Sequence, residues 1–102
     1  MTGDPLFERT RILVGKDGIA ALRAARVFLA GLGGVGSYAA EALARAGVGA
    51  ITLADHDRIA ASNLNRQLPA LNSTLGRRKI EVIAERIGDI NPACRLTLVE
   101  EF

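Results

Sequence analysis

Residues 27–36 constrain the fold of this chain more than any other segment. Their sequence, VFLAGLGGVG, is a short apolar run that passes into a glycine cluster, and an alanine-rich stretch follows. An apolar run of this length is typical of a buried parallel strand, and the glycines favour a tight turn into a helix. Glycines at such a turn let the backbone approach a phosphate, and the first helical turn offers unpaired N–H donors. The segment therefore predicts a nucleotide-binding strand, turn and helix.

The rest of the chain extends this unit into alternating strands and helices. We expect N-terminal helices in two pieces over residues 5–25, strands over 27–30, 51–54 and 95–99, and helices over 34–46 and 75–90. A polar loop over residues 56–63 and a helical turn within 64–71 should lie between the second strand and the last helix. The pattern predicts an α/β fold, a Rossmann-like parallel βαβαβ unit with N-terminal helices. In the first crossover helix we expect the stripe facing the sheet to be Val35, Ala39, Ala42, Leu43 and Ala46.

Composition narrows the class of protein further. The 102 residues suit one domain, and a net charge of +2 does not by itself favour nucleic-acid binding. Cys94 is the single cysteine, which excludes an internal disulfide and favours a cytoplasmic setting, and no apolar run is long enough to span a membrane. A parallel sheet of three strands leaves an exposed edge. We therefore expect residues 1–102 to be the nucleotide-binding half of a larger domain, as a piece of a longer chain.

An acidic residue follows the second expected strand. Asp55 lies near the spacing of about 20 residues at which a carboxylate meets a ribose hydroxyl, which suits NAD and ATP alike. Capping of the local turn is the alternative for Asp55, and for Asp57 it stands on equal terms with ligand binding. His56, between them, is interpreted as a polar contact rather than a catalyst.

Polar and basic side chains recur after this acid. An arginine matches phosphate oxygens with a fork of donors and amides can bind a base or sugar, although a solvated loop has the same composition. The residues concerned are Asn63, Asn65, Arg66 and Gln67. Arg77, Arg78 and Lys79 open the last expected helix, where cations oppose the helix dipole unless an anionic ligand is close. A solvated basic face, or contact of Arg77 and Arg78 with an RNA backbone, is the alternative.

Taken in order, these segments resemble the ThiF/MoeB/HesA family of adenylating enzymes, which are related to ubiquitin activators. The resemblance spans essentially the whole chain and rests on residues 31–36, 55–57, 62–67, 76–79 and 90–92. The Asn-Arg-Gln form of residues 65–67, Arg9 with Arg11, and residues 40–49 are most similar to the tRNA threonylcarbamoyladenosine dehydratase branch. Asn65 stands where activators of sulfur carriers usually have glutamine, which favours the same branch.

The resemblance implies adenylation of a carboxylate by Mg-ATP with release of pyrophosphate. It implies that the glycine turn approaches the phosphates, that Asp55 binds the ribose, and that Arg66 and Lys79 act with Asn63 on the triphosphate. The glycines concerned are Gly31, Gly33, Gly34 and Gly36. Arg9 matches an arginine that the family inserts into the ATP site of a second subunit, which implies a homodimer. The magnesium ligand and any catalytic cysteine are expected beyond residue 102.

Three alternatives remain open from the sequence. Adenylation of a ubiquitin-like sulfur carrier is the nearest, with a protein tail in place of tRNA as substrate. An NAD-binding Rossmann domain explains the glycine turn and Asp55 but gives no role to Arg66 and Lys79. A non-catalytic dimerisation module is the third.

Overall fold

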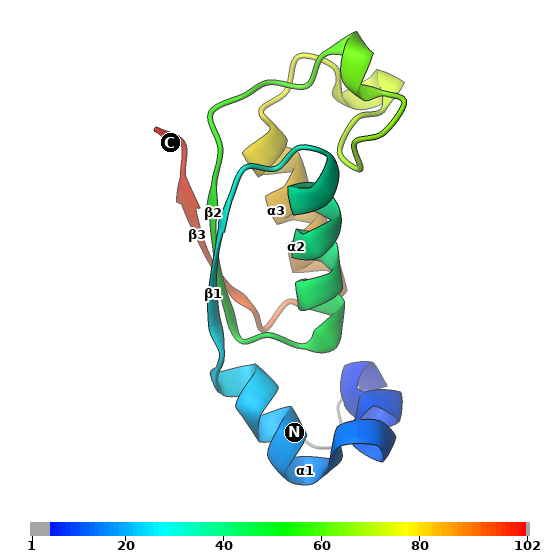
Figure 1. Cartoon of the computed structure of the whole chain (residues 1–102), viewed down its shortest axis with the longest axis vertical. Helices are drawn as coiled ribbons and strands as arrows, with labels where there is room; N and C mark the ends of the chain where they lie inside the picture. Colours follow the sequence, from blue (N-terminus) through cyan, green and yellow to red (C-terminus); the bar gives the residue numbers. More distant parts are fainter. Residues whose placement is uncertain (1–4, 102) are drawn as a thin grey trace.

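The computed structural model describes residues 5–101, and its strands and helices alternate as the sequence predicts (Figure 1). The N-terminal elements are the 3-10 helix η1 (Pro5–Phe7) and the helix α1 (Glu8–Ala24). The strands are β1 (Arg26–Ala30), β2 (Ala50–Ala54) and β3 (Arg95–Val99), and the crossover helices are α2 (Gly34–Ala46) and α3 (Lys79–Ile90). Two short 3-10 helices, η2 (Ala61–Asn63) and η3 (Asn72–Thr74), lie between β2 and α3.

The three strands form one parallel sheet in the order β1-β2-β3. Val27 pairs in register with Ile51, and Ile51 with Leu96, so the carboxyl ends of the strands lie at one edge. The expected parallel βαβαβ unit is confirmed. The described strands follow one another across the sheet in sequence order, without a reversal.

Helices α2 and α3 cover one face of this sheet (Figure 1). The core between them is aliphatic and buried, and it consists of Leu32, Ala40, Ala44, Val48, Ile51, Leu53, Ile80, Ile83 and Ile87. Arg86 of α3 donates from Nε to Glu41 of α2 at 2.7 Å, and this hydrogen bond lowers the pKa of Glu41. Among the described residues no helix covers the other face, where Phe28 is 61% exposed.

The predicted buried stripe of α2 is wrong at two of its five positions. Val35 is 86% exposed and Ala42 is exposed, whereas Ser37, Ala40 and Ala44 are the residues buried against the core. Positions 37, 40 and 44 follow the spacing of one helical face, displaced from the predicted stripe. Small side chains on this face allow α2 to lie close to the sheet.

One further boundary differs from the sequence prediction. The last helix begins at Lys79 rather than at residue 75, because Gly76 has a φ of 84° and the backbone of Gly76 and Arg77 bonds to Ile59 in the loop after β2. The helical turn expected within residues 64–71 is confirmed before Pro69, where the Gln67 N–H donates to the Asn63 carbonyl, four residues back, at 2.9 Å. The expected break in the N-terminal helix is confirmed at Gly15, whose φ is 72°.

Candidate functional site

The glycine turn between β1 and α2 owes its shape to two of its glycines. Gly31 has a φ of 89° and donates from its N–H to the Ala54 carbonyl at 2.8 Å, which holds the turn against β2. A Cβ on Gly36 would lie 1.9 Å from the Gly31 carbonyl oxygen, so only glycine fits there. Gly34 has neither constraint: its φ is not positive and a Cβ on it would meet nothing within 4 Å. The start of α2 therefore has open space over Gly34 and no side-chain cap on its first N–H groups.

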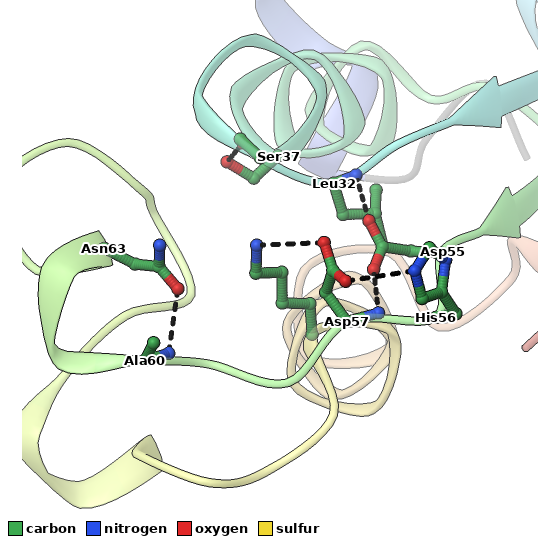
Figure 2. A network of polar contacts seen from close by, with 9 residues as sticks. Leu32, Ser37, Asp55, His56, Asp57, Ala60 and Asn63 are labelled. Carbon is green, nitrogen blue, oxygen red and sulfur yellow. Dashed lines mark hydrogen bonds and ion pairs between the residues drawn. The ribbon is translucent and has the colours of Figure 1, made fainter.

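Asp55 ties this turn to the loop that follows β2. Its Oδ2 accepts the Leu32 N–H at 2.7 Å and its Oδ1 accepts the Asp57 N–H at 2.7 Å, as Figure 2 shows. Asp55 is only 6% exposed. The capping role and the ligand role weighed for Asp55 are compatible, because each carboxylate oxygen has a further lone pair for a hydroxyl donor.

A short antiparallel bridge brings Lys79 to the same network. The Lys79 N–H donates to the Asp57 carbonyl at 3.1 Å, and Ile59 exchanges hydrogen bonds with the segment before α3, donating to Arg77 and accepting from Gly76. The Lys79 side chain is 7% exposed, and its Nζ lies 3.8 Å from Asp57 Oδ2. In the part of the chain that the structure describes, this long contact is the only ion pair of Lys79. An ammonium has three N–H donors, so this one retains capacity for an incoming anion.

The predicted segment 63–67 divides into a buried part and an exposed part. Asn63 and Gln67 are each 8% exposed, and Asn63 Oδ1 accepts the Ala60 N–H at 2.8 Å (Figure 2). The Gln67 amide lies beside Gly33, at 3.7 Å from where a Cβ would stand. Its buried Oε1 has no hydrogen-bond partner within residues 5–101, which costs about 1–3 kcal/mol unless a ligand or another group supplies a donor.

Asn65 and Arg66 are exposed, and their contacts stay within the loop. Arg66 Nη1 donates to the Ser62 carbonyl and to Asn65 Oδ1, both at 3.0 Å. The structure therefore joins the glycine turn, Asp55, Asp57 and Lys79, with Gln67 beside Gly33, whereas the described contacts of Asn63, Asn65 and Arg66 stay within their own loop.

The position of the Arg77 side chain is explained by an ion pair within the chain rather than by a ligand. Its guanidinium forms a two-point ion pair with Glu85 on α3, and this pair lowers the pKa of Glu85. Because α3 begins at Lys79, Arg77 also lies outside the first helical turn, and the predicted conflict with the helix dipole does not apply to it. Arg78 is the residue that precedes the helix, and its backbone forms the bridge with Arg58.

Other predicted residues lie away from this network. Arg9 is exposed on α1, and Figure 1 shows α1 at the end of the sheet opposite to the start of α2. Cys94 lies before β3 and is half-buried, and burial raises the pKa of its thiol, which disfavours the reactive thiolate. Within residues 5–101 no group of three or more acidic, histidine or cysteine side chains could hold a metal ion, and no helix is long and apolar enough to cross a membrane.

Sequence reasoning missed one polar residue of the turn. Ser37 is completely buried, and its Oγ donates to the Gly33 carbonyl at 2.5 Å (Figure 2 shows the side chain at the start of α2). The available signal was its position, because a serine four residues after the residue that precedes a helix can bond back to the carbonyl of that residue.

The glycine turn at the start of α2, the acid after β2 and the buried lysine stand on an α/β domain with a Rossmann-like fold. The ThiF family model matches residues 7–102, and the chain belongs to the ThiF family, as the sequence motifs indicated. The chain is 50% identical over 96 residues to the tRNA threonylcarbamoyladenosine dehydratase of Escherichia coli, covering 94% of this chain and 36% of that protein. It is 43% identical over 95 residues to the molybdopterin-synthase adenylyltransferase of E. coli, covering 91% of this chain and 38% of that protein.

A solved structure supports the same relationship. The E. coli tRNA N6-threonylcarbamoyladenosine dehydratase in complex with ATP superposes with a TM-score of 0.91 at 50% identity. The match covers 94% of this chain and 40% of that one. The chain thus spans well under half the length of the relatives it matches, and it corresponds to one part of them.

Proposed function

We propose that this chain is the ATP-binding part of an enzyme that adenylates a carboxylate and releases pyrophosphate, and that the carboxylate is the threonylcarbamoyl group of a modified tRNA adenosine. The observation that carries the proposal is the buried Lys79 ammonium, joined through Asp57 and Asp55 to the glycine turn. A buried cation linked to a glycine turn with open space over Gly34 suits a triphosphate. The relatives named dehydratases and adenylyltransferases support this class of reaction.

The proposed chemistry assigns different tasks to the residues. The substrate carboxylate attacks the α-phosphorus of ATP, the bond to the bridging oxygen breaks, and pyrophosphate leaves with the negative charge. Lys79 and Arg66 offset that charge, and Asp55 accepts the ribose hydroxyls. The amide or carbamoyl group of the same substrate then attacks the activated carbonyl, closes a ring and expels AMP.

The proposal includes magnesium because the nucleotide that reacts is Mg-ATP. Asp57 is the acidic side chain nearest to Lys79 in the described network, but it is engaged by Lys79 and by His56. We therefore keep the prediction that the magnesium ligand lies beyond residue 102.

Binding measurements separate this proposal from the dehydrogenase alternative. By calorimetry, the full-length protein is expected to bind ATP and to bind NAD at least about tenfold more weakly, because the triphosphate of ATP offers Lys79 more negative charge than the diphosphate of NAD does. Exchange of labelled pyrophosphate into ATP should depend on tRNA carrying the threonylcarbamoyl group. Exchange stimulated by a sulfur-carrier protein instead would favour the molybdopterin-type alternative, and tight NAD binding with ATP ignored would reject adenylation.

A homodimer is the second part of the proposal. Arg9 cannot serve the site of its own chain if α1 keeps its place at the far end of the sheet. Ile12 and Leu13, at helical spacing from Arg9, are 80% and 86% exposed, which is typical of a surface that another protein covers. We propose that a second copy covers this surface and receives Arg9 in its ATP site.

Mixing two inactive variants tests this arrangement. Arg9→Ala and Lys79→Met subunits, each of low activity alone, should regain up to about a quarter of wild-type activity when mixed, since a heterodimer then contains one intact site. The measurement is AMP formation by full-length protein after subunit exchange. No recovery, with heterodimers verified by mass, would contradict an arginine donated between subunits.

A further inference from the structure

The ion pair between Asp57 and Lys79 differs from an ordinary surface pair in how its two sides are exposed. The Lys79 side chain is 7% exposed, whereas that of Asp57 is 56% exposed. A buried cation needs a counter-charge, and here the counter-charge stands on the solvent side of the lysine. An anion that enters from solvent therefore meets Asp57 at the place where it would contact Lys79.

Asp57 is held in this position by three separate contacts. Its N–H donates to Asp55, and its carbonyl accepts the Lys79 N–H at 3.1 Å. His56 Nε2 lies 3.2 Å from Asp57 Oδ1, which leaves Oδ2 as the oxygen directed to Lys79. The separation of 3.8 Å between Oδ2 and Nζ exceeds that of a good charge-assisted hydrogen bond, so the pair is a weak one that phosphate oxygens can replace.

We infer that Asp57 is an exchangeable counter-ion of Lys79: it pairs with the ammonium in the empty site, gives it up to the phosphates of the bound nucleotide, and takes it back as pyrophosphate leaves. This inference rests on the proposed function, since it supposes a triphosphate at Lys79. It makes Asp57 a positioning residue rather than a ligand of the nucleotide. The carboxylate opposes anion binding and assists anion release.

Replacing Asp57 by asparagine tests this directly. Asp57→Asn keeps the backbone carbonyl that accepts the Lys79 N–H and removes only the competing charge. In the full-length protein we expect it to bind both ATP and inorganic pyrophosphate about fivefold more tightly, the value of an ion pair of this exposure. Turnover should fall while KM for ATP also falls, because pyrophosphate leaves more slowly.

Matched variants distinguish a counter-ion from a general charge effect. Asp89→Asn removes a negative charge from the exposed end of α3 and should bind pyrophosphate as the wild type does. If Asp57 acts only through Lys79, its replacement should matter little once the lysine is gone. In a Lys79→Met background, Asp57→Asn should therefore change pyrophosphate affinity by less than about twofold, which a double-mutant cycle measures.

The outcomes separate the two proposals. Wild-type protein that binds ATP, with Asp57→Asn binding it equally or more weakly, would overturn the exchange of counter-ions and leave adenylation standing. Wild-type protein that binds neither ATP nor pyrophosphate would overturn the proposed function, and the exchange with it. Tighter binding by Asp89→Asn to the same extent would also overturn the specific role of Asp57.

Discussion

Replacing Lys79 by methionine in the full-length protein is expected to lower the rate of AMP formation by about 10²- to 10³-fold. Lys79 supplies a buried positive charge, and in the proposed reaction negative charge develops on the departing pyrophosphate. A charge held in a site with little water stabilises that transition state more than an exposed one does. Methionine fills a similar volume, so the core residues next to Lys79 should keep their packing. The measurement is single-turnover AMP formation.

Arg77→Met is the matched control. It removes a cation only two positions away, but Arg77 is paired with Glu85 on the surface of α3. Its rate should stay within about twofold of the wild type, because exposed ion pairs contribute little. Equal losses in both variants would mean that positive potential in general, rather than the position of Lys79, supports the reaction.

Replacing Asp55 by alanine is expected to weaken both the fold and ATP binding. Leu32 is completely buried, so loss of the carboxylate leaves its N–H without an acceptor, whereas the Asp57 N–H, on an exposed residue, can turn to water. We expect the free energy of unfolding to fall by about 2 kcal/mol without ATP, and ATP affinity to fall at least about tenfold. Urea unfolding and calorimetry measure the two effects.

Two further variants separate the effect of Asp55 on stability from its effect on ATP binding. Asp89→Ala, an exposed aspartate on α3, should change stability by less than about 0.5 kcal/mol. Asp55→Asn keeps one acceptor oxygen and should fall between the wild type and Asp55→Ala. If Asp55→Ala unfolded at the wild-type urea concentration, the hydrogen bond to Leu32 would carry no stability, and Asp55 would act on the ligand alone.

The strands and the glycine turn could be predicted because local sequence determines them. Apolar runs predicted β1, β2 and β3 to within one residue, and the Ile80, Ile83 and Ile87 spacing predicted the buried face of α3. The motif order also predicted the family. These features depend on hydrophobic periodicity and on glycine conformation, both of which are visible in a single sequence.

The remaining differences come from contacts between distant segments. The first residue of α3 depends on the backbone bridge to Ile59, which no periodicity reveals. Val35 has the right residue type for a core, yet α2 turns a different face to the sheet because Ser37 and Ala40 allow a closer approach. The sequence made Arg77 a candidate phosphate ligand, but in the structure it pairs with Glu85, eight residues further along the chain.

The antiparallel bridge between residues 57–59 and 76–79 has a consequence for how this family can diverge. The bridge holds the two ends of the intervening segment together, so residues 60–75 form a loop with fixed ends. Lengthening such a loop adds little to the entropy cost of closing it. Insertions or exchanges at its tip leave the lysine and the sheet where they are. Because Asn63 and Gln67 also belong to this segment, such changes alter only that part of the site, while the glycine turn, Asp55 and Lys79 keep their positions.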